Sequence, residues 1–210
     1  MPLQESDRMR VQFVLDYRSI YSYLANSQVG ALDATVDYQV VDIVSIMKEV
    51  NNQPSPLCPP KAKYAQADAL RWAQLYHIPL VPNEALLRAL KQGDIDKALL
   101  SRAGIAAQHL GCFEQANNAL FRAVWAGVDD LVTSQGRATF TAINGLPASL
   151  WDVAESPKVD AALVANSARA IGNGVFGVPT FYIGQEMFFG NDRLVFVKER
   201  LAAAALGAAE

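Results

Sequence analysis

Hydrophobic and polar residues alternate in two short segments near the N-terminus of the chain. Residues 11–16 read Val-Gln-Phe-Val-Leu-Asp, and Val36, Tyr38 and Val40 repeat the same every-second-residue spacing. Side chains of a strand point alternately to the two faces of a sheet, so this spacing predicts two strands. Residues 22–29, which lie between them, can pack against the sheet as a helix. The chain therefore opens with a strand, a helix and a strand.

From residue 61 to residue 171 the apolar residues follow the spacing of helices. A further helix is expected to begin at Asp94, because aspartate is favoured at the N-cap position. The other predicted helices cover residues 64–73, 84–91, 117–125 and 157–170. Almost no strand pattern interrupts this region, so it predicts an all-helical insertion of residues 61–174.

The strand pattern returns near the C-terminus. Residues 180–183 and 186–189 predict a hairpin around Gly184-Gln185, and residues 192–206 predict a last helix. Strands at both ends of the chain, with helices between them, indicate one sheet built from both termini. We therefore expect an α/β fold with a discontinuous domain of residues 1–60 and 175–210.

Two short motifs lie at turns of this predicted domain. Ser19-Ile20-Tyr21-Ser22 follows the first strand and opens the first helix, and Val178-Pro179-Thr180 leads into the third strand. This layout resembles that of a thioredoxin-like domain, in which the first turn carries Cys-x-x-Cys. Both cysteine positions are serine here, so the motif indicates thiol binding without disulfide chemistry.

Each polar residue at these turns has a structural and a functional interpretation. Ser19 can be the helix N-cap, or its hydroxyl can donate a hydrogen bond to a thiolate at the positive end of the helix dipole. The Val178-Pro179 bond is a common place for a cis peptide, whose backbone could pair with an extended peptide; the alternative is an ordinary strand entry. Asn191 and Asp192 can cap the last helix, or Asp192 can bind an α-amino group.

Composition and charge exclude several classes of protein. Hydrophobic residues make up 51% of the chain and charged residues 19%, as in a globular protein. A net charge of −3 argues against a general nucleic-acid binder. Residues 1–8 are too polar for a secretory signal, so we expect a cytoplasmic protein. The cysteines and histidines lack the spacing of a metal site, and we expect none; they are Cys58, Cys112, His77 and His109.

The segment Gly172-Asn173-Gly174-Val175-Phe176-Gly177 matches the letters of a dinucleotide-binding motif. That motif needs a strand before it and a helix after it, and here the predicted order is reversed. The glycines are instead expected to end a helix and shape the approach to Pro179.

Five segments together resemble the family of 2-hydroxychromene-2-carboxylate isomerases and kappa-class glutathione transferases. Each segment alone is a weak signal, but all five occur in the family's order over nearly the whole chain. They are Asp16-Tyr17-Arg18-Ser19-Ile20-Tyr21-Ser22-Tyr23-Leu24-Ala25-Asn26, Asn52-Gln53-Pro54 with Pro60-Lys61 and Tyr64, Phe121-Arg122-Ala123-Val124-Trp125, Gly177-Val178-Pro179-Thr180-Phe181 and Phe189-Gly190-Asn191-Asp192-Arg193.

The resemblance implies that glutathione binds between these segments, with Ser19 facing its sulfur atom. The residues implied to hold the rest of the tripeptide are Asn52 and Lys61 at the glycyl end, Val178 along the cysteinyl backbone, and Asn191 and Asp192 at the γ-glutamyl end. These residue types suit a ligand with two carboxylates and one ammonium group.

The activity implied is the glutathione-dependent interconversion of 2-hydroxychromene-2-carboxylate and trans-o-hydroxybenzylidenepyruvate in naphthalene-type aromatic degradation. The first alternative is a glutathione transferase that conjugates another electrophile. The second is a non-catalytic binding module on the same fold. The large apolar helical fraction also permits a homodimer.

The chain departs from the family pattern at two positions beside the serine. Ile20 replaces a proline, and Arg18 replaces an apolar residue. Arg18 could bring a positive charge to the mouth of the site and attract an acidic substrate, or it could lie in solvent. Together with Tyr21 and Lys48 it is a candidate for contact with a substrate carboxylate or hydroxyl.

Overall fold

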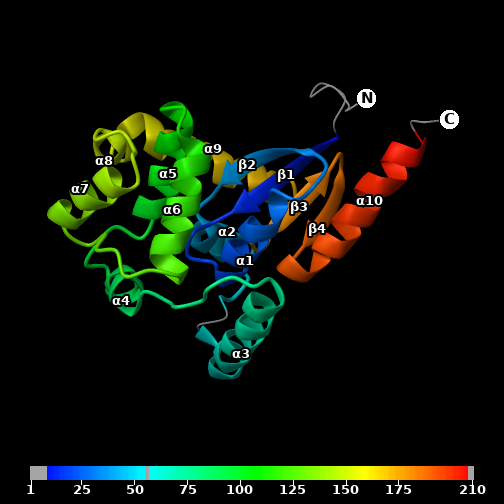
Figure 1. Cartoon of the computed structure of the whole chain (residues 1–210), viewed down its shortest axis with the longest axis horizontal. Helices are drawn as coiled ribbons and strands as arrows, with labels where there is room; N and C mark the ends of the chain where they lie inside the picture. Colours follow the sequence, from blue (N-terminus) through cyan, green and yellow to red (C-terminus); the bar gives the residue numbers. More distant parts are fainter. Residues whose placement is uncertain (1–8, 55–56, 208–210) are drawn as a thin grey trace.

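The computed structural model describes residues 9–54 and 57–207, and Figure 1 shows the whole arrangement. The sheet elements are β1 (Arg10–Leu15), β2 (Thr35–Val40), β3 (Thr180–Ile183) and β4 (Glu186–Phe189). The helices are α1 (Ile20–Val29), α2 (Ile43–Glu49), α3 (Pro59–Leu75), α4 (Glu84–Gln92), α5 (Leu99–His109), α6 (Phe113–Trp125), α7 (Ser134–Ile143), α8 (Leu150–Ala154), α9 (Pro157–Gly172) and α10 (Leu194–Gly207), with the 3-10 helix η3 (Asn191–Arg193).

The four strands form one sheet in the order β2-β1-β3-β4. β1 and β2 are parallel, whereas β3 runs antiparallel to both β1 and β4. The first and last parts of the chain therefore lie side by side in the sheet, as the sequence predicts (Figure 1). The α/β thioredoxin-like prediction is confirmed.

The alternation of the strands sends apolar side chains to both faces of the sheet. Phe13 and Phe181 lie opposite each other in β1 and β3, with their rings stacked 4.9 Å apart, in the core that α1 and α10 complete. Val14 and Tyr182 belong to a second cluster, to which α2 contributes Ile46. Burial on both faces removes much apolar area from water, and this stabilises the sheet.

The helical part of the chain joins the same core through Tyr17, which is completely buried. Its hydroxyl donates to Asn117 Oδ1 at 3.0 Å, and its carbonyl accepts from Trp125 Nε1 at 2.8 Å. Both partners lie on α6. On α5, Gly104 leaves room for the phenol, because a Cβ there would lie 2.5 Å from the Tyr17 hydroxyl.

Helix α9 lies against the sheet, although its residues fall within the expected insertion. Asn166 donates to the carbonyl of Val40 at 3.0 Å, and Gln39 donates to the carbonyl of Asn166 at 2.8 Å. These side chains fix α9 beside β2 (Figure 1).

Two expected helix starts are wrong. α5 begins at Leu99, and Asp94 is not its N-cap; Asp96 instead accepts from the backbone N–H of Ala98 at 2.7 Å. Asp192 is not the N-cap of the last helix, because it lies inside η3, whose N-cap position is Gly190. Gly190 has φ of 112°, a backbone conformation that favours glycine.

No helix within residues 9–54 and 57–207 is long and apolar enough to cross a membrane. In the same residues, no three His, Cys, Asp or Glu side chains are grouped as metal ligands.

Candidate active site

Ser19 is the N-cap of α1 and also lies beside the loop that precedes β3. Its Oγ accepts from the backbone N–H of Ser22 at 3.1 Å and donates to the carbonyl of Val178 at 3.2 Å. The structural interpretation of Ser19 as a cap is therefore confirmed, and its hydroxyl faces the second predicted turn as well. The N–H groups of Ile20 and Tyr21 lie in the first turn of α1, where backbone donors have no acceptor within the helix. Such an end favours an anion.

The Val178-Pro179 peptide bond is cis, which is the first of the two interpretations that the sequence leaves open. Two hydrogen bonds hold the loop around it: the Thr180 hydroxyl donates to the Gly177 carbonyl at 2.7 Å, and the Gly190 N–H donates to the Pro179 carbonyl at 2.9 Å. The sequence suggests that the Val178 backbone could pair with an extended peptide, and one of its two polar groups, the carbonyl, already has a partner within the chain. This carbonyl accepts from Ser19, so the serine hydroxyl would have to turn in order to donate to a ligand.

A buried ion pair holds the turn before Ser19. Asp16 is fully buried and accepts from the Arg18 N–H at 2.8 Å, from Arg18 Nε at 2.9 Å, and from the Ile43 N–H at 2.9 Å. Arg18 also reaches Asp42, the N-cap of α2. The carbonyl of Asp16 accepts from the Ser19 N–H at 3.0 Å, so the ion pair is connected directly to the backbone of Ser19.

The prediction for Arg18 needs correction. Its side chain is 14% exposed and lies between Asp16 and Asp42, so it neither lies in solvent nor offers a free positive charge to a substrate. Burial lowers the pKa of Arg18, but the two carboxylates outweigh burial and raise it. The role that the structure gives Arg18 is to hold the base of the turn.

Asn191 is a buried amide that lies near Tyr76. The residue is 2% exposed, yet neither polar atom of its side chain has a hydrogen-bond partner among the described residues. An unpartnered buried amide is costly, so a small shift of Tyr76 or a polar group from outside the chain would stabilise it by supplying a partner.

Asp192 follows on the surface and pairs with Arg193. Its negative charge reaches two tyrosines that face the same region. Burial raises the pKa of Tyr76, its proximity to the Asn191 amide lowers it, and Asp192 raises it by a smaller amount. The pKa of Tyr21 is raised mainly by burial and by Asp68, with Asp192 contributing less.

Asn52 bridges two loops of the site. Its Nδ2 donates to the Phe176 carbonyl at 2.8 Å, and its Oδ1 accepts from the Gln53 N–H at 2.8 Å. Lys61 lies exposed in the first turn of α3, and Lys48 lies exposed in the last turn of α2. The structure thus brings Ser19, Val178 and the Asn52 loop together, while the two lysines remain at the surface.

Asp68 is a residue of this region that the sequence analysis did not identify. Its carboxylate accepts from the Tyr21 hydroxyl at 3.0 Å and from the Tyr64 hydroxyl at 3.4 Å. Tyr64 and Asp68 are four residues apart on α3, a spacing that could have suggested their contact. Tyr21 lies on α1, and only the fold brings it to Asp68.

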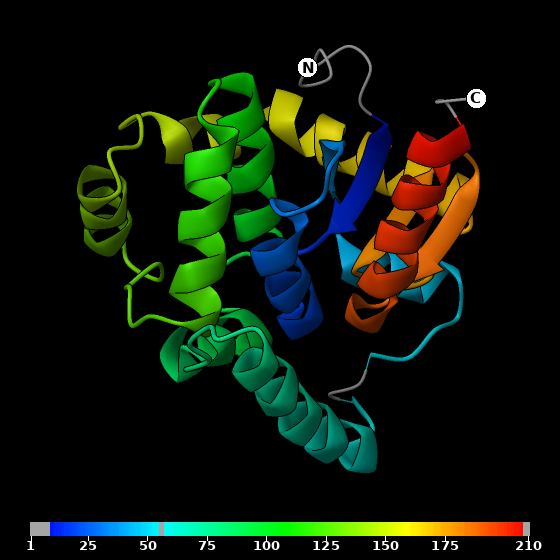
Figure 2. The ribbon, with the colours of Figure 1, turned by 45° about the vertical axis from the view of Figure 1, so that its right-hand side comes forward.

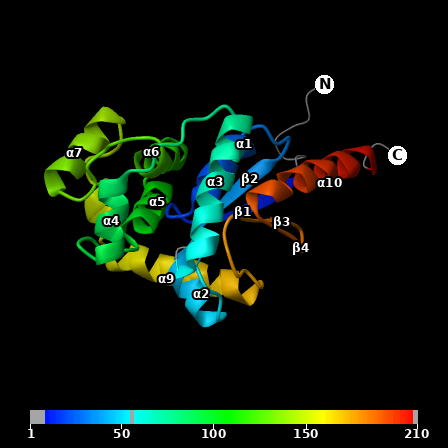
Figure 3. The same ribbon diagram turned by 90° about the horizontal axis from the view of Figure 1, so that it is seen from below.

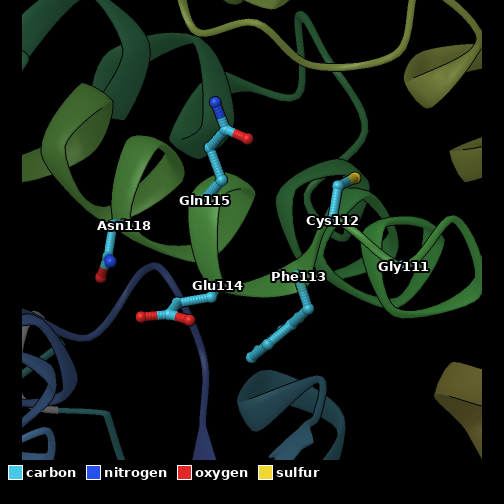
Figure 4. A pocket seen from close by; sticks show the side chains of 6 residues that line it. All are labelled: Gly111, Cys112, Phe113, Glu114, Gln115 and Asn118. Atoms are coloured by element: carbon cyan, nitrogen blue, oxygen red, sulfur yellow. The ribbon is translucent and has the colours of Figure 1, made fainter.

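A surface hollow elsewhere on the molecule contains none of the predicted site residues. Figure 4 shows it at the start of α6, with Phe113, Glu114 and Gln115 along its wall. Cys112 lies at its end, and burial raises the pKa of this thiol. A raised pKa favours the protonated form of a thiol over the nucleophilic thiolate.

Comparisons with known proteins cover nearly the whole chain. Residues 10–202 match the family model of the DSBA-like thioredoxin domain. The chain is 30% identical to the 2-hydroxychromene-2-carboxylate isomerase of Pseudomonas putida, over 92% of this chain and 94% of that protein. It is 23% identical to glutathione S-transferase kappa 1 of Rattus norvegicus, over 79% and 76% of the two chains.

A solved structure of a 2-hydroxychromene-2-carboxylate isomerase superimposes on this chain with a TM-score of 0.81. The two are 26% identical, and the superposition covers 96% of this chain and 98% of the other. Sequence and backbone therefore point to the same relatives.

Proposed function

Since the chain belongs to the family of DsbA-like thioredoxin domains, and within it to that of the 2-hydroxychromene-2-carboxylate isomerases, we propose that it is a glutathione-dependent isomerase of this substrate. The observation that carries the proposal is Ser19 at the N-terminus of α1, beside the cis Val178-Pro179 bond. Ser22 takes the second cysteine position of the redox relatives, so the site has no disulfide to exchange.

Glutathione supplies a thiolate that can add reversibly to the conjugated substrate, so that a double bond rotates as a single bond and no net oxidation occurs. The task of Ser19 is to stabilise that thiolate. Its hydroxyl can turn from the Val178 carbonyl toward the sulfur, and the first N–H groups of α1 add the positive end of the helix dipole. A hydrogen bond to the charged form of a thiol lowers its pKa.

The other end of the tripeptide suits η3. The unpartnered amide of Asn191 can hydrogen-bond the γ-glutamyl group, and the exposed carboxylate of Asp192 can pair with its ammonium. The Val178 backbone would pair with the cysteinyl residue, as in an added strand. Lys61 would meet the glycyl carboxylate from the first turn of α3, while Asn52 would hold the loop beside it.

A glutathione transferase is the second candidate, because the chain also resembles the kappa 1 transferase. The two functions would share the thiol site and differ in whether glutathione is released unchanged. The homodimer, the cytoplasmic location and the degradation pathway remain predictions from the sequence.

The deciding experiment follows the ultraviolet spectrum of 2-hydroxychromene-2-carboxylate with the protein, with and without glutathione. We expect glutathione-dependent formation of the trans ring-opened isomer. In Ser19→Gly, kcat/KM should fall about 10- to 100-fold, the factor that one hydrogen bond to a charged group supplies. Glycine costs the N-cap only about a few tenths of a kcal/mol, so the fold should be retained.

Ser27→Ala is the matched control, because Ser27 also lies on α1 and its hydroxyl contacts only local groups: it donates to the Leu24 carbonyl and accepts from Gln28 Nε2. It should leave kcat/KM unchanged. Binding of glutathione without isomerisation would favour the transferase. A chain that does not bind glutathione at all would refute the site assignment.

A further inference from the structure

Two tyrosine hydroxyls from different helices share the carboxylate of Asp68. Tyr21 is the second residue of α1, two positions after Ser19, and its hydroxyl lies 3.0 Å from Asp68 Oδ2. Tyr64 approaches Oδ1 at 3.4 Å, and Arg71 lies 3.9 Å from the same oxygen. Figures 2 and 3 show α3 running past the start of α1, and the Tyr21–Asp68 hydrogen bond joins the two helices.

The direction of the Tyr21–Asp68 hydrogen bond decides what Tyr21 can offer a ligand. An ionised carboxylate only accepts, and a phenol has a single proton. The Tyr21 proton is therefore used by Asp68, and only the oxygen lone pairs remain. Burial and the bond to Asp68 both raise the pKa of Tyr21, so the phenol keeps this proton throughout the neutral range.

The charged residues near Tyr21 also favour a hydroxyl over a carboxylate as its ligand. Asp68 contacts its hydroxyl, and the field of Asp192 also reaches it. Arg71 lies near Asp68, and Arg193 pairs with Asp192, so each negative charge is partly compensated. A substrate carboxylate at this position would still find no donor on Tyr21, because the phenol proton is hydrogen-bonded to Asp68. A substrate hydroxyl would find an acceptor.

We propose that Tyr21, held by Asp68, accepts a hydrogen bond from the hydroxyl group of a hydroxyaryl substrate beside Ser19, and that Asp68 is its positioning residue. This deepens the proposed function and rests on it. Of the two substrate groups expected for Tyr21 from the sequence, the hydroxyl is thereby selected over the carboxylate.

The test compares two ligands that differ in one donor: trans-o-hydroxybenzylidenepyruvate and its methyl ether. Their dissociation constants are measured by calorimetry in the presence of S-methylglutathione, which fills the thiol site without reacting. The protein should prefer the hydroxyl ligand about tenfold, the factor of one ordinary hydrogen bond. In Tyr21→Phe this preference should fall to within twofold.

Asp68→Ala should also abolish the preference, because it frees the Tyr21 proton to donate to the ether oxygen. Asp68→Asn should restore it, since the amide oxygen still accepts from Tyr21. Tyr64→Phe is the matched control, because it removes the longer bond on the exposed side of Asp68 and should keep the preference. A merely structural role of Asp68 would not produce this pattern.

Equal affinity of the unmodified protein for both ligands, or an undiminished preference in Tyr21→Phe, would overturn the inference. Tyr21→Phe decides the question even if Asp68→Ala does not fold. Failure of S-methylglutathione to bind would instead refute the proposed function, so the two failures are distinguishable.

Discussion

Replacing Arg18 by alanine should destabilise the fold far more than its position on a surface turn suggests. Asp16 is fully buried, and Arg18 supplies three of its hydrogen bonds, two of them from the guanidinium. Without the guanidinium, Asp16 keeps the N–H groups of residue 18 and Ile43 but loses its countercharge. Removing one partner of a buried pair costs about 3–5 kcal/mol, and we expect the lower end, about 3 kcal/mol, because those backbone donors remain.

Urea unfolding followed by tryptophan fluorescence measures this loss. With a slope of about 2.5 kcal/mol per molar urea, the midpoint should fall by about 1.2 M. Arg10→Ala is the matched control, since Arg10 forms a similar bidentate ion pair with Asp37 at the protein surface. The two side chains are 69% and 45% exposed. Exposed pairs contribute little, so this midpoint should barely move. Equal shifts for the two variants would refute the argument that burial makes the Arg18 pair important.

Three smaller predictions concern the core. Gly104→Ala should lower stability by about 1–3 kcal/mol, because the new Cβ would lie 2.5 Å from the Tyr17 hydroxyl. The loss should appear as a lower melting temperature. An unchanged melting temperature would mean that α5 can shift to make room for the Cβ. Ser22→Ala should leave stability unchanged or raise it by up to about 1 kcal/mol, since the Ser22 hydroxyl is buried without a partner among the described residues. A clear loss of stability would contradict this. Burial raises the pKa of Tyr17 well above its ordinary 10.0, so its contribution to stability is complete below pH 10 and is lost as pH rises above that value. Unfolding free energies between pH 8 and 11 should therefore fall more steeply with pH in the unmodified protein than in Tyr17→Phe, and parallel curves would count against it.

The strands were predictable because their signal is local. Residues 180–183 and 186–189 are assigned in the structure as the sequence predicts, since alternation and the Gly184 turn lie within a few residues of each other. Helix starts were less accessible. Asp94 has a residue type that is favoured at the N-cap. The helix α5 nevertheless begins at Leu99, and it is the Asp96 side chain that accepts from the Ala98 N–H just before it.

The site was predictable in its motifs and not in its cross-contacts. Ser19 and the Val178-Pro179 bond could be identified because each sits at a recognisable turn. The environment of Arg18 depends on Asp42, 24 residues away, and that of Tyr21 on Asp68, 47 residues away. Pattern analysis within one segment carries no information on such pairs, which only the folded chain brings together.

The contact between Ser19 and Val178 joins residues 159 positions apart, and this has a consequence for synthesis of the protein. During translation, β1 and β2 leave the ribosome long before β3 has been made. The edge of β1 that pairs with β3 in the folded protein therefore stays unpaired for most of synthesis. Long-range strand pairing is slow, and an unpaired strand is prone to aggregate. We therefore expect early packing of α1 against α6 to cover the apolar face of β1 in the nascent chain. The contact between Ser19 and Val178 can form only after residue 178 has been made, near the end of synthesis.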